Sequence, residues 1–234
     1  KRAVELLLNG RIDATASGPD HKEAIRLAGY KYPGVTEMLA DMAGAKQVFT
    51  LLVVGPMRIF QVTTHVSLRE ALELLTYERI FSYICHAHDV LSQLEKEKPR
   101  LAVAGLNPHA GENGLMGREE IEVISPAIEA ARQKGILVSG PIPADSIMIR
   151  GLRNEFSGLI FLYHDQANIG IKLLAEQYPP VTVAVGLPFV RTTVAHGTAH
   201  DIAYKGIANY KPMHKAILLA AELALKRRAG SAGA

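Results

Sequence analysis

Three of the chain's nine histidines stand in polar clusters that directly follow apolar, strand-like segments. They are His65, His109 and His164, which come after the segments 60–62, 101–106 and 158–163. Neutral imidazoles that converge on one point, with a position left open for water or substrate, are the ligands of a catalytic divalent metal. One such histidine alone is more often a hydrogen-bonded structural residue. The repetition of the pattern favours a metal site.

Two cations lie close to further apolar segments. The polar cluster 191–193 follows the predicted strand 181–186, and the guanidinium fork of Arg191 suits a carboxylate or phosphate. Lys172 interrupts the apolar segment 169–174. It is either a surface residue of a short helix or edge, or a group that contacts an anionic substrate or delivers a proton. The residues alone leave these alternatives open.

Other polar residues have simpler interpretations. The group 85–89 contains one cysteine, two histidines and an aspartate, but it lies within a predicted amphipathic helix that runs from Arg79 towards Pro99. Histidines two residues apart point to different faces of a helix, so we interpret this group as helix surface. Asp145 is interpreted equally well as a helix N-cap, because Asp often accepts the first free N–H groups of a helix.

The segments between these clusters alternate between strand and helix patterns. Strands are predicted at 12–16, 48–54, 60–64, 101–106, 136–139, 158–163 and 181–185. Helices are predicted around 4–8, 20–27, 36–43, 68–75, 79–98, 121–135 and 217–225, with Asp20 as the N-cap of the second. Apolar strands separated by helices predict a mainly parallel α/β sheet, with ligands at the carboxyl ends of its strands.

Composition excludes several classes of protein. The 234 residues carry a formal net charge of +3 and one cysteine, so a disulfide framework and CxxC metal motifs are excluded. No apolar run approaches the roughly 18 residues of a membrane span, and the first residues show no signal-peptide pattern, so we expect a cytoplasmic protein without a membrane partner. Lys and Arg are scattered apart from residues 226–228, so a nucleic-acid partner is not expected.

Five motifs, taken in order, resemble the 4-hydroxythreonine-4-phosphate dehydrogenase family, which has an isocitrate and isopropylmalate dehydrogenase-like fold. The motifs are TTHVSLREA, AGLNPHAGENGLMGREE, GPIPADS, YHDQANIGIKLL and GLPFVRTTVAHGTAHDIAYKGIAN. The resemblance implies an α/β fold with mainly parallel sheets in α/β/α layers, and two subdomains with a cleft. Residues 22–170 would form the metal-binding and dimerisation subdomain. Residues 1–21 and 171–234 would form the remaining part of the nucleotide-binding subdomain.

The resemblance also implies roles for individual residues. The metal ligands would be His65, His109 and His164, shared across a homodimer interface. The substrate would contact Thr36, Asp145, Lys172, Thr182 and Arg191, with Lys172 and Asp145 as catalytic residues. The adenine side of NAD would contact His196, Gly197, Ala199, Asp201 and Asn209. The family's opening strands and its GDPAGIGPE segment have no counterpart, so we expect a missing upstream segment and an incomplete nucleotide-binding subdomain.

The activity implied by the resemblance is NAD-dependent oxidation of a phosphorylated four-carbon hydroxy acid, followed by decarboxylation of the keto acid. Zinc would be the preferred metal, and Mg, Mn, Co and Ni would also be compatible with these ligands. It would lower the pKa of the substrate hydroxyl and hold the developing charge on oxygen, while Lys172 returned a proton.

Four positions depart from the family pattern near the inferred pocket. They are His21, Val35, Thr182 and Ala195, which replace asparagine, histidine, asparagine and aspartate. These changes favour the family's second branch, whose substrates resemble 4-phospho-D-threonate and 4-phospho-D-erythronate. The alternatives are a dihydrodiol dehydrogenase of the same family, a truncated non-catalytic metal-binding dimer and, by analogy of fold alone, a phosphate acyltransferase.

Overall fold

The computed structural model describes residues 1–32, 34–95 and 97–231. The chain forms two compact units. The terminal unit contains Lys1–Leu51 and Pro179–Ala234, and the central unit contains Leu52–Tyr178. The division expected from the resemblance also joined the two ends of the chain, but it placed the boundaries at residues 22 and 170. The metal-binding, dimerisation and nucleotide-binding roles of the two parts stay predictions.

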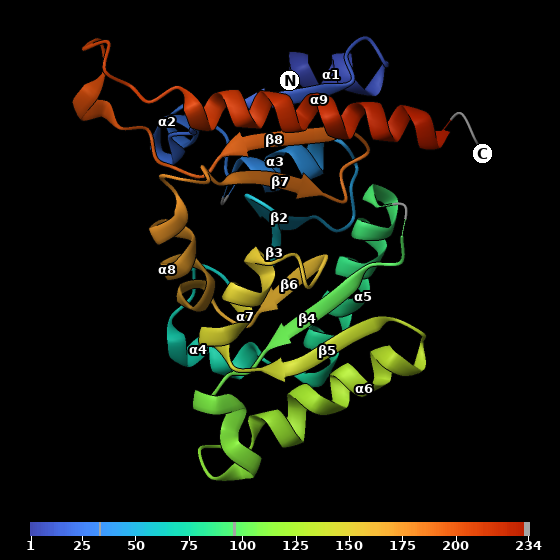
Figure 1. Ribbon diagram of the computed structural model, residues 1–234. Helices are drawn as coiled ribbons and strands as arrows, with labels where there is room; N and C mark the ends of the chain where they lie inside the picture. The colour runs from blue at the N-terminus through green and yellow to red at the C-terminus, as the bar shows by residue number, and fades with distance from the viewer. Residues whose placement is uncertain (33, 96, 232–234) are drawn as a thin grey trace. The chain divides into compact units, whose positions relative to one another are not determined.

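Four parallel strands form the sheet of the central unit. In spatial order they are β3 (Met57–Gln61), β6 (Gly158–Phe161), β4 (Arg100–Ala104) and β5 (Leu137–Ile142). The arrowheads of β4 and β5 point the same way in Figure 1. Since all four strands are parallel, their carboxyl ends meet at one edge, where α/β proteins place ligands. The predicted parallel arrangement is therefore confirmed for this unit.

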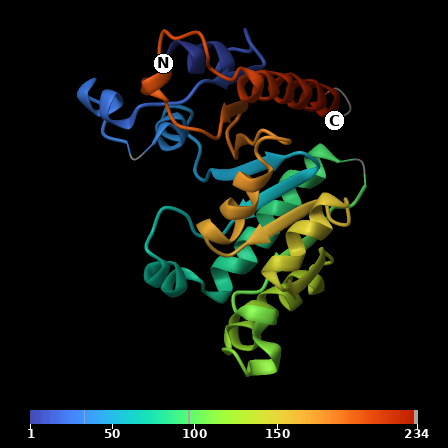
Figure 2. The same cartoon turned by 60° about the vertical axis from the view of Figure 1, so that its left-hand side comes forward.

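Helices pack against these strands through apolar stripes. They are α5 (Tyr77–Leu94), α6 (Ser125–Gln133), α7 (Ala144–Leu152) and α8 (His164–Leu174), and the short α4 (Leu68–Leu74) precedes α5 in the chain. The stripe of α5 buries Ile80, Ile84 and Leu91, as its spacing predicts. Leu91 packs so close to the start of β6 that a Cβ at Gly158 would lie 2.6 Å from it. Figure 2 shows α5 alongside the strands of this unit.

Helices α7 and α8 also contribute apolar side chains to the core of the central unit. Ile147 of α7 and Ile171 of α8 pack in one apolar cluster with Leu159 and Phe161 of β6. Successive residues of a strand point to opposite faces, so Leu159 and Phe161 share one face. This packing fixes the start of α8, which is the element that carries His164.

The terminal unit contains β1 (Ala14–Ser17), β8 (Val190–Val194) and β7 (Val181–Val185), neighbours in that order. Strand β1 pairs with β8 in parallel, and β7 pairs with β8 antiparallel. The cluster 191–193, expected just after a strand, lies inside β8, so this expectation was wrong. The reason is a turn at Gly186, which has a φ of +98° and reverses the chain after β7. The boundary between the units falls within β2 (Phe49–Val54).

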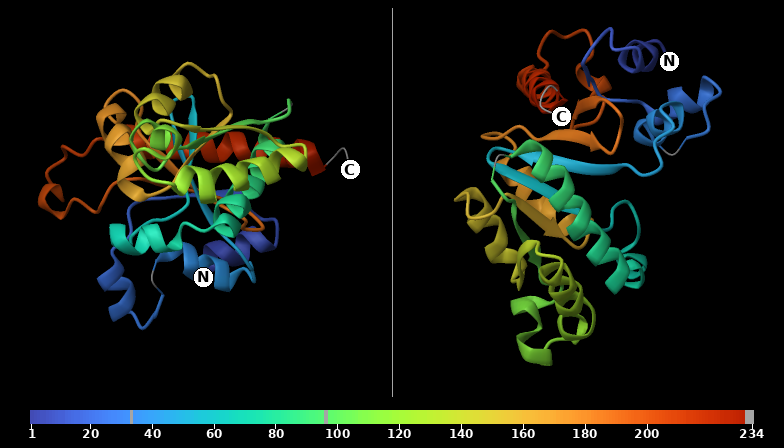
Figure 3. Two further views of the ribbon diagram at one scale, coloured as in Figure 1. Left: turned by 90° about the horizontal axis from the view of Figure 1, so that it is seen from below. Right: turned by 90° about the vertical axis from the view of Figure 1, so that its right-hand side faces the viewer.

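Three helices of the terminal unit begin and end close to the predicted positions, namely α1 (Arg2–Leu8), α2 (Lys22–Leu27) and α3 (Val35–Met42). The fourth, α9 (Lys211–Ser231), extends beyond the predicted range 217–225 at both ends. Helix α9 lies along β1 and β8 (Figure 3). The Thr192 hydroxyl donates to the Ala216 carbonyl at 2.8 Å. The N-cap of α2 is His21 and not Asp20, because the His21 Nδ1 accepts from the Ala24 N–H at 3.1 Å.

No helix in the described part of the chain is both long and apolar enough to cross a membrane.

Candidate functional site

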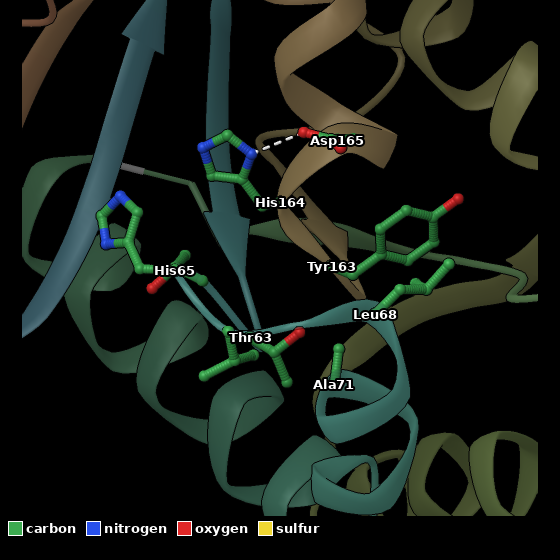
Figure 4. A pocket seen from close by; sticks show the side chains of 9 residues that line it. Thr63, His65, Leu68, Ala71, Tyr163, His164 and Asp165 are labelled. Atoms are coloured by element: carbon green, nitrogen blue, oxygen red, sulfur yellow. Dashed lines mark hydrogen bonds and ion pairs between the residues drawn. The ribbon is translucent and has the colours of Figure 1, made fainter.

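Two of the three predicted metal ligands, His65 and His164, meet in a pocket of about 180 Å³ in the central unit (Figure 4). His65 follows β3, and His164 begins α8 directly after β6. Because β3 and β6 pair in parallel, both histidines lie at the same edge of the sheet. Their ring centroids are 5.5 Å apart. The pocket is lined by Thr63, Thr64, His65, Val66, Leu68, Ala71, Tyr163, His164 and Asp165.

Hydrogen bonds orient His164 from both its ring and its backbone. The ring Nδ1 lies 2.7 Å from Asp165 Oδ1, on the side of the ring shown by the dashed line in Figure 4. The Gln61 and Asn168 amides donate to the His164 carbonyl at 3.2 and 2.9 Å. A carboxylate on Nδ1 favours the tautomer that leaves Nε2 as a metal ligand.

His65 adopts an unusual backbone conformation, with a φ of +53°. The left-handed region is unfavourable for a residue with a Cβ, and residues held in it cluster at functional sites. The chain is held firmly just before it: the Thr63 N–H and hydroxyl both donate to the Leu162 carbonyl, at 3.2 and 2.8 Å. The surrounding backbone therefore fixes the direction in which His65 leaves the strand.

The pair of histidines fits a divalent ion. Two imidazoles that bind one ion through nitrogen at about 2.0–2.1 Å have ring separations of this size. The carboxylate on His164 Nδ1 matches the outer partners that metal-binding histidines use. The structure does not bring His109 to the pair, and among residues 1–32, 34–95 and 97–231 no three His, Cys, Asp or Glu side chains form a metal-binding group.

His109 instead lies on the exposed turn η1 (Pro108–Gly114). Residues 109–113 all have positive φ values, of 50°, 53°, 77°, 43° and 56°, so the backbone makes a left-handed helical turn. The His109 Nδ1 lies 3.1 Å from Glu112 Oε2, which repeats the imidazole and carboxylate arrangement of His164. The sharing of ligands between two subunits stays a prediction.

Sequence reasoning missed two residues that hold this edge of the sheet. Gln166 joins two strand ends, since its Oε1 accepts from the Leu162 N–H at 2.8 Å and its amide donates to the Gly105 carbonyl at 2.7 Å.

The second residue is Glu120, whose carboxylate side chain is only 3% exposed. Glu120 stands four residues before Ile124 and therefore shares the apolar face of the predicted helix. A carboxylate on this apolar face was the signal in the sequence.

The candidate catalytic residues Lys172 and Asp145 are both exposed. Lys172 lies near the end of α8, and Asp145 lies in the first turn of α7. The N-cap of α7 is Pro143, so the interpretation of Asp145 as an N-cap was wrong. The Ser146 hydroxyl donates to Asp145 Oδ1 at 3.3 Å. A catalytic role for either residue stays a prediction.

The other candidate substrate residues lie in the terminal unit. Thr36 is half-buried in α3, and Thr182 stands opposite Thr193 in the pairing of β7 with β8.

Arg191 is a buried cation with 3% exposure in β8. Its Nη2 donates to the Ser17 hydroxyl at 3.0 Å and lies 3.4 Å from Asp20 Oδ2. Burial lowers the pKa of its guanidinium, while the Asp20 carboxylate acts in the opposite direction. Its Nε is buried and has no hydrogen-bond partner within the described part of the chain. A buried donor without a partner is unusual, and a guanidinium is suited to an anionic group.

The candidate NAD residues lie in an exposed segment of the terminal unit. The residues are His196, Gly197, Ala199, Asp201 and Asn209. The segment folds on itself: His196 Nδ1 lies 2.9 Å from the Gly197 carbonyl, and Ala199 has a φ of +47°. Asn209 Oδ1 accepts from the Lys211 N–H at 3.0 Å, where α9 begins. The binding of NAD by this segment stays a prediction.

The group 85–89 lies within α5, as predicted. His86 Nδ1 lies 2.6 Å from the Ser82 carbonyl, which is a local contact within the helix. Cys85, His86 and His88 are partly buried and Asp89 is exposed, so the interpretation of the whole group as helix surface was only partly right.

The sequence profile described as "Pyridoxal phosphate biosynthetic protein PdxA" matches residues 1–220. D-threonate 4-phosphate dehydrogenase from Salmonella typhimurium is 43% identical over 224 residues, which are 96% of this chain and 68% of that protein. 4-hydroxythreonine-4-phosphate dehydrogenase from Geobacter metallireducens is 43% identical over 228 residues, which are 97% of this chain and 67% of that protein. These two relatives are enzymes.

The solved structures agree with the sequence comparisons. The structure of 4-hydroxythreonine-4-phosphate dehydrogenase from Klebsiella pneumoniae has a TM-score of 0.86 at 42% identity, covering 95% of this chain and 67% of that one. Isocitrate dehydrogenase from Methylococcus capsulatus has a TM-score of 0.55 at 15% identity, covering 97% of this chain and 73% of that one, and shares the fold alone. The expected fold and the resemblance are both confirmed, and the chain belongs to the PdxA family.

Proposed function

We propose that this protein is an NAD-dependent and divalent-metal-dependent dehydrogenase that oxidises the hydroxyl group of a phosphorylated four-carbon hydroxy acid. Decarboxylation of the resulting keto acid follows. The observation that carries the proposal is the His65 and His164 pair, with Asp165 on the far side of the His164 ring, at the carboxyl edge of the central sheet. The dehydrogenase names of the relatives support the same class of reaction.

His65 and His164 of one subunit hold the metal, and His109 completes the ligand set across a homodimer interface. Zinc suits three imidazoles best, and Mg, Mn, Co and Ni are compatible. When bound, the ion lowers the pKa of the substrate hydroxyl and stabilises negative charge on its oxygen. His164 keeps its ligand nitrogen in the required tautomer because Asp165 occupies Nδ1. The homodimer and a cytoplasmic location are parts of the proposal.

The residues of the terminal unit bind the anionic parts of substrate and cofactor. Arg191 offers its unpaired Nε–H to a carboxylate or phosphate oxygen, with Thr36 and Thr182 as further contacts. The exposed segment that contains His196, Gly197, Ala199, Asp201 and Asn209 binds the adenine side of NAD. When bound, NAD would accept a hydride from the substrate carbon, and the proton of the substrate hydroxyl would pass to water.

Lys172 and Asp145 handle protons in the central unit. Lys172, in the last turn of α8, delivers a proton to the carbon that loses carbon dioxide, and Asp145 lies in the first turn of α7, the helix that precedes α8 in the chain. Both side chains are exposed, so each can exchange its proton with water.

The substrate proposed first is 4-phospho-D-threonate or 4-phospho-D-erythronate. His21, Val35, Thr182 and Ala195 depart from the pattern of the biosynthetic enzymes. The second candidate is 4-hydroxythreonine 4-phosphate, which is favoured by the name of the Geobacter relative.

The test combines metal analysis with turnover. The purified chain is loaded with Zn²⁺, Mg²⁺ or Mn²⁺ and given NAD with each of the three phosphorylated acids, while NADH formation is followed. His164→Ala is expected to lose metal and activity, and the exposed His214→Ala on α9 is the matched control. If the metal-loaded protein oxidises none of the three acids, the proposed activity is wrong. Equal metal content in wild type and His164→Ala overturns the metal site.

A further inference from the structure

We propose that Glu120 is a positioning residue that holds the left-handed turn 109–113 in place and thereby presents His109 to the metal. This inference rests on the proposed function, in which His109 is a ligand. It adds a residue from a different segment, at the start of η2 (Glu120–Ile124), to the residues that build the metal site.

The Glu120 carboxylate binds the chain directly before the turn. Its Oε1 accepts from the Leu106 and Asn107 N–H groups, both at 2.7 Å. Its Oε2 accepts from the Asn107 side-chain amide at 2.8 Å. Three donors therefore converge on one carboxylate, and two of them belong to the residue that precedes Pro108 and His109.

The carboxylate is buried and lacks a counter-cation. Glu120 is 3% exposed, and within the described part of the chain no Lys, Arg or His forms an ion pair with it. Burial of a charge that is stabilised by neutral donors alone is unfavourable relative to a well-packed apolar residue. A carboxylate at this position of an apolar helix stripe is thus poorly explained by stability and better explained by a requirement for this turn.

The turn packs directly onto the carboxylate. A Cβ added at Gly111 would lie 2.7 Å from Glu120 Oε2, so the middle of the turn approaches the carboxylate as closely as glycine allows. A Cβ added at Gly105 would lie 2.9 Å from the Ala110 Cα, so the end of β4 also touches the turn. Glu120 therefore contacts both the entry to the turn and its centre.

The turn needs such support because of its backbone conformation. L-residues disfavour the left-handed region, and His109, Ala110, Glu112 and Asn113 all occupy it. Without the donors held by Glu120, the chain would relax towards ordinary conformations, and the imidazole of His109 would lose its fixed direction. Positioning of a ligand by a buried neighbour is the role that outer residues play in metal sites.

The neighbouring Glu119 provides a matched control. Glu119 Oε2 accepts from the same Asn107 amide at 2.7 Å, but Glu119 is exposed and receives no backbone N–H from residues 106 or 107. Glu120→Gln keeps the size of the side chain and removes its charge. We therefore compare Glu120→Gln with Glu119→Gln, alone and combined with His109→Ala.

The experiment measures Zn²⁺ affinity of the full chain by competition with a chelating dye, and hydrogen exchange of residues 106–116 without metal. Glu120→Gln is expected to weaken Zn²⁺ binding by about 10- to 100-fold and to speed exchange in the turn. Glu119→Gln is expected to change the affinity less than about 3-fold, as a surface substitution does. In the His109→Ala background, Glu120→Gln is expected to cause no further loss of affinity.

Two results would overturn the inference while sparing the proposed function. One is an unchanged Zn²⁺ affinity in Glu120→Gln when His109→Ala does lose affinity. The other is a loss that adds to that of His109→Ala, because a general structural defect acts independently of the ligand. If His109→Ala itself leaves Zn²⁺ binding intact, the ligand assignment of the proposed function fails, and the presentation of His109 fails with it.

A second variant covers the case in which Glu120→Gln does not fold. Asn107→Ala removes the side-chain amide that donates to Glu120 Oε2 and leaves the Leu106 and Asn107 N–H groups that donate to Oε1. It is expected to weaken Zn²⁺ binding in the same direction by about 3- to 10-fold. An affinity equal to that of wild type in this variant would contradict the inference.

Discussion

His65 and His164 lie with their ring centroids 5.5 Å apart, although they come from distant parts of the sequence. Parallel pairing of β3 with β6 in the register Ile59↔Leu159 places their carboxyl ends side by side. The Thr63 hydroxyl, which donates to the Leu162 carbonyl, extends this contact beyond the strands. The two imidazoles therefore meet because two backbone segments are fixed first.

Asp165 is predicted to orient His164 for metal binding. Asp165→Asn replaces the charged partner of Nδ1, so the imidazole loses its preferred tautomer. Metal affinity is expected to fall by about 10- to 100-fold, measured by competition with a chelating dye. Asp89→Asn, at an exposed site on α5, is the control and is expected to bind metal like the wild type. Equal affinities in the two variants would contradict the assigned role.

The left-handed backbone of His65 predicts an unusual order of stability for two substitutions. At a φ of +53°, glycine is free of the Cβ penalty, so His65→Gly is expected to be more stable than His65→Ala by about 1 kcal/mol. At His214 in helix α9 the order should reverse by about 1 kcal/mol, because glycine is a poor helix former. Urea unfolding of the four variants gives both differences. If His65→Ala is more stable than His65→Gly, the backbone at position 65 is not strained.

Gln166 is predicted to hold the ends of β4 and β6 together. Gln166→Leu leaves the Leu162 N–H and the Gly105 carbonyl without their partner, at a cost of about 1–3 kcal/mol for each group. The free energy of unfolding should fall by about 2–4 kcal/mol. Gln177→Leu, at an exposed position, is expected to stay within about 0.5 kcal/mol of the wild type. A similar loss in both variants would refute the proposed bridge.

Gly186 is predicted to tolerate no side chain. A Cβ there would lie 2.3 Å from the Gln47 carbonyl oxygen, and the φ of +98° is itself unfavourable for alanine. Gly186→Ala should lower the melting temperature through a loss of about 2 kcal/mol or more. Gly18→Ala is the comparison, since no atom lies within 4 Å of its added Cβ. The prediction fails if both variants melt at the same temperature.

Cys85 is predicted to react slowly with alkylating reagents. Burial raises the pKa of its thiol, with Asp89 acting in the same direction and Lys134 opposing it. The thiolate is the reactive form, so at neutral pH less of Cys85 is reactive than of an exposed thiol. The rate with iodoacetamide should rise with pH up to a midpoint above that of free cysteine. A midpoint at or below that of free cysteine would contradict this prediction.

Local sequence was enough to predict most of the elements. The spacing of Ile80, Ile84 and Leu91 predicted α5, and apolar runs predicted β4, β6 and β7. These patterns succeed because a buried face must repeat with the period of its own secondary structure. The positions of His65 and His164 after their strands followed from the same patterns.

Capping and reversals were less predictable. His21 caps α2 in place of Asp20, and Pro143 stands where Asp145 was the candidate cap of α7. The strand β8 was missed because a turn at Gly186 and its close approach to Gln47 are not encoded by periodicity. Caps and reversals depend on single hydrogen bonds and close contacts, which the surrounding chain decides.

The sequence by itself determined the family, the α/β alternation and the presence of histidines and cations suited to metal and anion binding. Only the tertiary structure decided that His65 and His164 meet, that His109 lies on a separate left-handed turn, and that Arg191 is buried beside Ser17. Periodicity reports which face of one element is buried. Contacts between distant elements depend on strand register and on hydrogen bonds such as those of Glu120 and Gln166, which join segments that are remote in sequence.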